Sequence, residues 1–88
     1  MRTFQVPLTN KGCIVGRKRE FCDVLIDYDK SVSGKHCQIT TKNGKFYIAD
    51  LQSSNGTYVN NNKIISEIEI SSGTVIRLGN LQLRFEVR

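Results

Sequence analysis

Three side chains from separate parts of this 88-residue chain have the types needed to bind an anion. Arg17 supplies a guanidinium, and Ser33 and Ser54 supply hydroxyl donors. A phosphate monoester is nearly a dianion at neutral pH and carries three acceptor oxygens, so a reversible site needs a cation together with several neutral donors. Arginine suits the cationic role because its fork matches two phosphate oxygens. The residue types therefore indicate an anion site, provided that the fold brings the three segments together.

The polar run around Asn55 and Gly56 adds a second kind of chemistry. Residues 50–60 place small polar side chains around a glycine, after one apolar segment and before another. Such a turn presents backbone N–H groups, hydroxyls and a carboxamide at one spot, and these groups bind anions and peptide backbones. Asn55 can hold the backbone of a bound strand through both its C=O and its NH2 group. Taken alone, the run predicts only a tight hairpin turn.

The apolar pattern favours strands over helices. No segment of about eleven or more residues has a helical apolar period, whereas residues 81–87 alternate in the manner of a half-buried strand. Asn43-Gly44 is a strong hairpin signal, and Val24-Leu25-Ile26 predicts a short strand buried on both faces. Many short strands with regular turns predict an all-β chain, an antiparallel β-sandwich of two twisted sheets with short loops and little or no helix. In that architecture, loops from distant parts of the chain can converge at one end.

Three motifs in this order and spacing resemble the forkhead-associated (FHA) domain, a module that binds phosphothreonine peptides. They are Gly16-Arg17, residues 33–39 and residues 50–60, and the resemblance covers most of the chain, from about Gly16 to Leu83. It implies the FHA/SMAD-like sandwich and a phosphopeptide site made by its loops.

The resemblance also implies a role for each candidate side chain. Arg17 and Ser33 correspond to the phosphate-binding arginine and serine, Ser54 to a second small hydroxyl residue at the phosphate, and Asn55 to the asparagine that holds the peptide backbone.

Three further residues are implied as structural support of the site, namely Gly16, His36 and Gly56. His36 would tie two loops together by hydrogen bonds without touching phosphate. Gly56 would permit a backbone geometry that a β-carbon forbids. Asp50, at the start of the polar run, is expected to cap its loop rather than to act in catalysis.

The chain departs from the FHA pattern at Gly34, where most members place Arg, Lys or Asn as a further phosphate ligand. Glycine cannot supply that contact, and Lys35 is the candidate to reach back in its place. Losing one charge-assisted contact would cost about 1.5–3 kcal/mol. A second departure is Thr74, where an aspartate often follows the glycine and where a structural turn is expected.

The positive charge is uneven along the sequence. Residues 1–49 contain nine Lys and Arg against four Asp and Glu, and residues 50–88 contain four against four, so the net charge of +5 lies in the first half. If the segments 17–20 and 30–35 converge, this excess forms one electropositive face that attracts anions. The alternative is a generally basic surface without a focus.

Length and composition indicate one small globular domain over residues 1–88, either excised from a longer protein or trimmed to the minimum. No apolar run approaches the roughly 20 residues that span a bilayer, and no signal peptide is evident. The three cysteines, none in a C-x-x-C spacing, indicate reduced thiols in an intracellular protein, cytoplasmic or nuclear. A single histidine leaves too few ligands for a metal site, and no cofactor is expected.

Two functions remain open for the FHA-like fold. The first is a phosphothreonine-dependent protein–protein interaction module, with residues 27–32 and the turn Gly79-Asn80 tuning specificity for the peptide. The alternative is a phospho-independent scaffold that binds a folded partner through a sheet face. Nucleic-acid binding is disfavoured because aromatic residues do not interleave with the basic ones. An enzyme is disfavoured because no nucleophile lies beside a base. A monomeric domain is expected.

Overall fold

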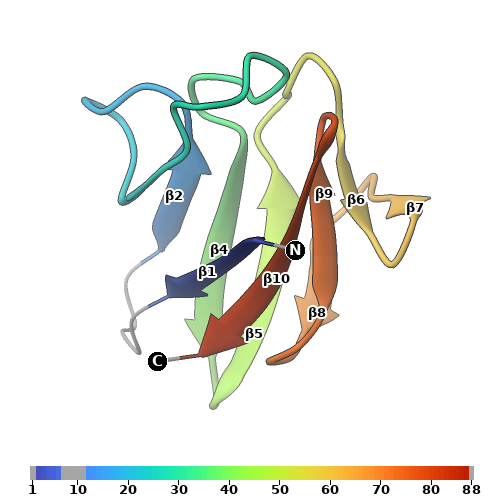
Figure 1. The fold of residues 1–88 in the computed structure, drawn as a ribbon. Helices are drawn as coiled ribbons and strands as arrows, with labels where there is room; N and C mark the ends of the chain where they lie inside the picture. The colour runs from blue at the N-terminus through green and yellow to red at the C-terminus, as the bar shows by residue number, and fades with distance from the viewer. Residues whose placement is uncertain (1, 7–11, 88) are drawn as a thin grey trace.

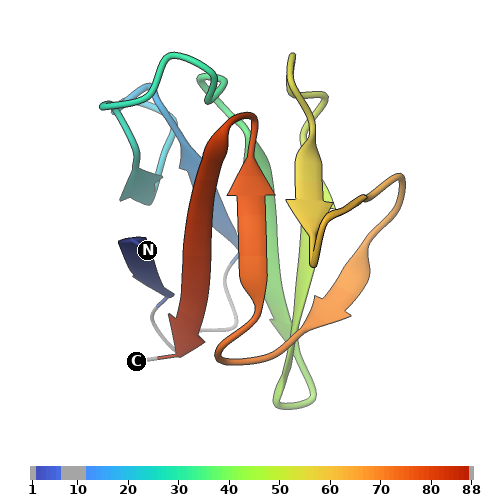
Figure 2. The same cartoon turned by 45° about the vertical axis from the view of Figure 1, so that its right-hand side comes forward.

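The computed structural model of the chain describes residues 2–6 and 12–87 and contains two five-stranded sheets that face each other (Figure 1). The first sheet has the order β1-β10-β9-β6-β7. Its strands are β1 (Arg2–Val6), β10 (Leu81–Val87), β9 (Val75–Leu78), β6 (Thr57–Val59) and β7 (Asn62–Lys63). Figure 2 shows β10, β9 and β6 side by side in front of the second sheet.

The second sheet has the order β3-β2-β4-β5-β8. Its strands are β3 (Val24–Leu25), β2 (Cys13–Gly16), β4 (Cys37–Lys42), β5 (Lys45–Asp50) and β8 (Ile68–Ile70). All pairings are antiparallel except β1 with β10 and β2 with β3, which are parallel. The described residues contain no helix. The predicted all-β sandwich is therefore confirmed.

The core lies between the sheets and is supplied by alternate residues of the strands. In β10, Leu83 and Phe85 are buried while Arg84 between them is exposed, as the alternation predicts. The Phe85 ring meets the ring of Phe46 from β5 edge to face, with centroids 5.4 Å apart. This contact joins the two sheets across the core.

The hairpin between β4 and β5 turns at Asn43 and Gly44, both with positive φ (53° and 77°), which suits the twist of paired strands. That prediction is confirmed. The prediction of a strand buried on both faces at residues 24–26 is wrong. The two-residue β3 is an edge strand with half-buried side chains, and only Ile26, beyond its end, is buried. A short apolar run does not distinguish an edge strand that turns into the core from a central one.

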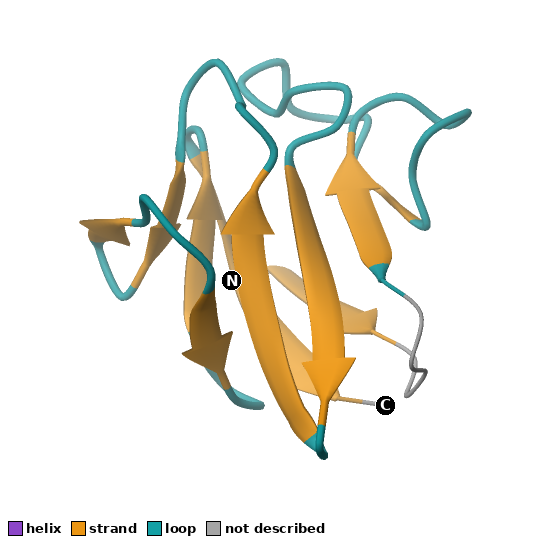
Figure 3. Cartoon of the chain, turned by 180° about the vertical axis from the view of Figure 1, so that it is seen from behind, coloured by secondary structure: helices purple, strands orange, loops and turns teal. Residues whose placement is uncertain are grey.

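Four loops gather at one end of the sandwich, formed by residues 17–23, 26–36, 51–56 and 79–80 (Figures 1 and 3). The turns around residues 43–44 and 71–74 lie at the opposite end. We call the first the loop end and the second the hairpin end. In the described ranges, no helix has the length and apolar character to cross a membrane.

Candidate functional site

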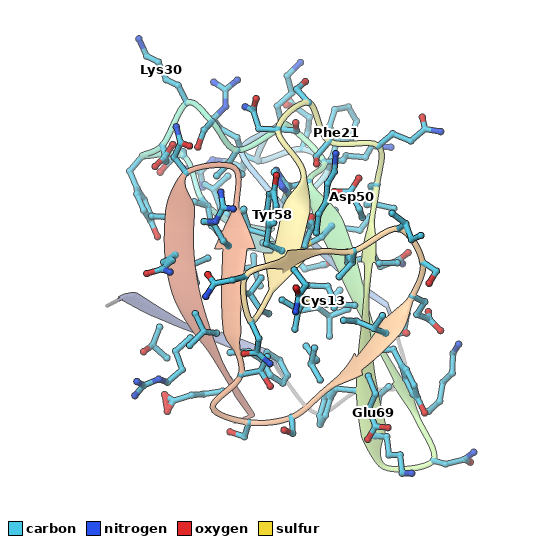
Figure 4. The ribbon with its side chains drawn as sticks, turned by 90° about the vertical axis from the view of Figure 1, so that its right-hand side faces the viewer. Cys13, Phe21, Lys30, Asp50, Tyr58 and Glu69 are labelled. Atoms are coloured by element: carbon cyan, nitrogen blue, oxygen red, sulfur yellow. The ribbon has the colours of Figure 1, made fainter. Side chains whose placement is uncertain are left out.

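Backbone hydrogen bonds bring the two basic loops together. The Arg17 N–H donates to the carbonyl of Ser33 at 3.0 Å, and the Lys18 N–H donates to the carbonyl of Gly34 at 3.2 Å. The segments 17–20 and 30–35 therefore converge, as the charge argument required. Lys30, at the tip of the second loop, projects from the loop end into solvent (Figure 4).

Among the described residues, the Arg17 side chain has one hydrogen bond, made by a single nitrogen. Its Nε donates to the carbonyl of Val32 at 2.8 Å, and the side chain is exposed. The bond orients the guanidinium plane and leaves both terminal nitrogens to donate to a ligand. A fork fixed in this way loses little freedom when it binds two oxygens of one anion.

Ser33 and Ser54 are neighbours in space although they come from different loops. The Ser54 backbone N–H donates to the Ser33 hydroxyl oxygen at 3.0 Å. Because that oxygen accepts this bond, the hydroxyl hydrogen of Ser33 remains available to a third group. Ser54 is exposed, so its own hydroxyl lies beside the same space.

Asn55, the residue after Ser54, uses one N–H of its side-chain amide for a hydrogen bond within the protein. Its Nδ2 donates to the carbonyl of Ser31 at 3.0 Å, while the residue stays exposed. One N–H and the Oδ1 acceptor remain, which is the donor–acceptor pair that an extended peptide backbone requires.

His36 is buried and ties two of the loops together. Its Nδ1 accepts the N–H of Ser33 at 3.0 Å, so Nε2 carries the proton and donates to the carbonyl of Gly56 at 2.9 Å. Burial lowers the pKa of His36, although the Gly56 carbonyl and the Asp50 carboxylate act in the opposite direction. Neutral His36 therefore bridges the two loops, and its part in supporting a phosphate site stays a prediction.

Asp50 organises the turn that carries Ser54 and Asn55. Its carboxylate accepts the N–H and the hydroxyl of Ser53 and the hydroxyl of Thr57. Burial raises the pKa of Asp50, but these hydrogen bonds outweigh burial and bring the pKa below its ordinary value. The predicted capping role is confirmed.

Ser31 joins the two segments that the sequence suggested for specificity. Its hydroxyl donates to Asp29 at 2.6 Å and accepts the N–H of Asn80 at 2.8 Å. The hydroxyl and the backbone N–H of Ser31 both lower the pKa of Asp29. The loop 27–32 and the turn Gly79-Asn80 thus form one continuous rim, and their role in specificity stays a prediction.

Glycines permit the close approach of these loops. A Cβ on Gly16 would collide with the carbonyl oxygen of Gly34. Gly56 has a φ of 87°, which side chains rarely adopt. Their role as structural support of a phosphate site stays a prediction. Thr74 lies at the hairpin end and closes its turn with Ser71 through both its N–H and its hydroxyl, as expected.

The two lysines near Gly34 have different contacts: Lys35 lies at the Phe21 ring and Lys18 lies over Gly34. The Lys35 ammonium lies 4.9 Å from the centroid of the Phe21 ring, so Phe21 holds it in this conformation. Lys18 was not singled out by the sequence. Its Cγ and Cδ lie 3.1 and 3.2 Å from where a Cβ on Gly34 would stand, so its stem covers the gap that the glycine leaves. No sequence signal other than its position next to Arg17 pointed to it.

The three cysteines are free thiols, with Cys13 and Cys37 buried and Cys22 half-buried. Burial raises the pKa of Cys13 to about 11, which keeps that thiol protonated at neutral pH. Within residues 2–6 and 12–87, no three His, Cys, Asp or Glu side chains cluster as metal ligands would.

Comparison with known proteins agrees with this architecture. The FHA domain family matches residues 13–79, and the chain belongs to that family. It is 40% identical over 65 residues to the E3 ubiquitin-protein ligase CHFR of Danio rerio, a match covering 72% of the chain and 10% of CHFR. It is 27% identical over 75 residues to the FHA domain-containing protein FhaB of Mycobacterium tuberculosis, a match covering 85% of the chain and 47% of FhaB.

Solved structures show the same fold. A structure from a study of phosphothreonine-dependent FHA domain interactions superposes with a TM-score of 0.76 at 35% identity, covering 85% of this chain and 75% of the other. The chain spans at most about half the length of the two curated relatives.

Proposed function

We propose that this FHA domain binds phosphothreonine peptides at its loop end in protein–protein recognition. One observation carries the proposal. Arg17 is held through Nε, and no other described residue bonds its terminal nitrogens, while Ser33 keeps its hydroxyl hydrogen beside Ser54. A cationic fork and two hydroxyl groups on backbone-linked loops suit a dianionic ester.

Each residue then has a defined part in binding. The terminal nitrogens of Arg17 and the hydroxyls of Ser33 and Ser54 bind the phosphate oxygens. Asn55 binds the peptide main chain through its remaining N–H and Oδ1. His36 contributes by fixing the spacing of the loops from beneath.

A second cation is proposed for the phosphate from Lys18 or Lys35. Lys18 is the better placed, because its stem lies over Gly34. At that position the FHA pattern mostly has Arg, Lys or Asn. Lys35 would first have to leave the Phe21 ring, a contact of about 0.5–1 kcal/mol at an exposed site. Lys35 is therefore the second choice as a phosphate ligand, after Lys18.

The domain is proposed to be a monomeric binding module rather than an enzyme. Both ring nitrogens of His36 are occupied by backbone groups, so the single histidine has no nitrogen left to act as a base. We also propose an intracellular setting, in line with three thiols that form no disulfide. The activities of the longer relatives are not transferred to this chain.

The experiment is calorimetric titration with an oriented peptide library that carries a fixed phosphothreonine, followed by matched peptides with threonine and phosphoserine. The phosphothreonine peptide is expected to bind, with the unphosphorylated peptide weaker by about a hundredfold or more. Arg17→Gln should remove most of this difference. Arg19→Gln, an exposed neighbour in the same loop, is the matched control and should change affinity by less than about threefold.

Lys18→Gln tests the second cation and should weaken phosphopeptide binding by about three- to tenfold. Equal affinity for phosphorylated and unphosphorylated peptides would overturn the proposal. Partner binding indifferent to Arg17→Gln would favour the phospho-independent scaffold instead.

A further inference from the structure

Two cations flank a tyrosine on the outer face of the first sheet, directly below the loop end. Tyr58 of β6 pairs with Lys63 of β7 on one side and with Arg77 of β9 on the other. Because Thr57 and Val59 are buried in the core, Tyr58 and its cross-strand neighbours point outward. Figure 4 shows Tyr58 on the viewer's side of this sheet, just beneath the loops.

Arg77 is pre-organised by two contacts. Its guanidinium lies 3.7 Å from the centroid of the Tyr58 ring. Its Nη1 donates to the carbonyl of Gly79 at 2.7 Å, which ties the group to the turn at the rim of the loop end. A planar guanidinium held on an aromatic face keeps its remaining N–H groups for a carboxylate.

Lys63 comes from β7, the neighbour of β6 on the side away from β9. Its Cε is 3.2 Å from where a Cβ on Gly56 would stand, and Cε1 of Tyr58 is at the same distance. The Lys63 stem therefore folds back toward the Asn55-Gly56 turn. Its ammonium is one bond beyond Cε and therefore lies near the Asn55-Gly56 turn, beside the proposed peptide site.

These two cations have no acidic partner in the described part of the chain. The one ion pair there joins Lys42 to Glu67, away from this face. Two uncompensated positive charges around one aromatic ring attract a carboxylate that arrives with a ligand. Charge counted along the sequence did not reveal this pair of cations, because Lys63 and Arg77 belong to the half of the chain with no net charge.

We propose that this strip of Lys63, Tyr58 and Arg77 binds an Asp or Glu side chain that flanks the phosphothreonine, so that the domain selects acidic phosphopeptides. The inference rests on the proposed function, because the phosphate held by Arg17 brings the peptide flank to the rim. An extended peptide advances about 3.3 Å per residue, and the Gly56 turn that follows Asn55 lies against Lys63 and Tyr58, so the proposal places the carboxylate a few residues from the phosphate.

The test uses a phosphothreonine peptide with alanine flanks, into which a single Asp is introduced at each of the four positions on either side. Each is compared with the same peptide carrying Asn. At one or two neighbouring positions the Asp peptide should bind about two- to fivefold more tightly at low salt. The preference should shrink as salt screens the charges.

The double variant Lys63→Gln, Arg77→Gln should bring the ratio of Asp to Asn affinity to about one. Phosphate-dependent binding of the Asn peptide should persist, which also shows that the variant is folded. Arg84→Gln is the matched control, because Arg84 is exposed on the same sheet but pairs with Val75, farther from the rim.

The outcomes separate the two proposals. Phosphate-dependent binding with equal affinity for Asp and Asn at every position would overturn the acidic preference alone. A preference that Arg84→Gln abolishes as fully as the double variant does would also overturn it. Binding that does not depend on phosphate would overturn the proposed function, and this inference with it.

Discussion

The two ends of the sandwich use glycine for different purposes. At the hairpin end, Gly44 and Gly73 have positive φ values of 77° and 96°, and a Cβ on either would meet nothing within 4 Å. At the loop end, a Cβ on Gly79 would lie 2.5 Å from the carbonyl oxygen of Ser31, and one on Gly16 would collide with the Gly34 carbonyl. Glycine thus serves local backbone geometry at one end and contact between distant loops at the other.

The hydrogen bonds differ in the same way. The hairpin-end turn from Ser71 to Thr74 has two hydrogen bonds of its own over three residues, and its other backbone bonds go to Phe85 of β10, no more than 12 residues away. At the loop end, His36 bonds Gly56 across 20 residues and Asn80 bonds Ser31 across 49. The comparison teaches that the loop end is built to hold several segments in register, which lowers the cost of ordering them around a ligand.

The largest effect is expected for His36→Ala, which should lower the free energy of unfolding by about 4 kcal/mol. The change leaves the Ser33 N–H and the Gly56 carbonyl without partners and opens a cavity. Urea denaturation followed by circular dichroism measures it. A loss below about 1 kcal/mol would mean that the loop end does not depend on this bridge.

Thr40→Val is the matched control for His36. The Thr40 hydroxyl oxygen is buried without a hydrogen-bond partner in the described part of the chain. Replacing it with a methyl group removes an unsatisfied polar atom, so stability should stay within about 0.5 kcal/mol or rise. Together the two variants separate a buried polar group that links loops from one that links nothing.

A smaller effect should distinguish Gly79→Ala from Gly44→Ala. Both place a side chain at positive φ, which costs about 1 kcal/mol. Gly79→Ala must also push Ser31 away, so it should cost a further 1–2 kcal/mol or so. It should weaken phosphopeptide binding as well, whereas Gly44→Ala should leave binding unchanged. Denaturation and peptide titration of both variants check this, and equal losses of stability would erase the difference between the two ends.

The smallest effect is the pH dependence of stability contributed by His36. Its pKa is lowered in the folded protein relative to its ordinary value of 6.5. The unfolded chain therefore binds the proton first, and the stability present above pH 6.5 falls as the pH drops below that value. Asp50, whose pKa is also lowered from its ordinary 3.8, adds a further loss at more acidic pH.

This dependence is measured by denaturation without peptide, because the phosphate ester itself titrates with a second pKa of about 6. Histidine titration by NMR gives the pKa directly. A His36 pKa at or above its ordinary value would contradict the structural account of the loop end.

Much of the fold and the proposed site could be predicted because local signals carry them. Asn43-Gly44 predicts its own hairpin, and the alternation in residues 81–87 predicts which side chains of β10 are buried. The motifs that contain Arg17, Ser33 and Ser54 could be identified because spacing along the chain preserves them.

The rest depends on register and side-chain direction, which spacing does not reveal. Lys63 and Arg77 come together only because β7 and β9 pair with β6 on either side of Tyr58. Lys18 lies over Gly34 because backbone hydrogen bonds join residues 17 and 18 to residues 33 and 34. The Lys35 side chain points to Phe21, and its position in the sequence does not reveal that direction.

The central claim is that the loop end, and not the hairpin end, binds a phosphorylated threonine. Titration of the 15N-labelled domain with a phosphothreonine peptide, and with its unphosphorylated counterpart, tests it most directly. The account predicts amide shifts centred on Arg17, Ser33, Ser54 and Asn55, none at Asn43-Gly44, and none with the unphosphorylated peptide. Shifts centred on the hairpin end, or the same shifts with both peptides, would contradict it.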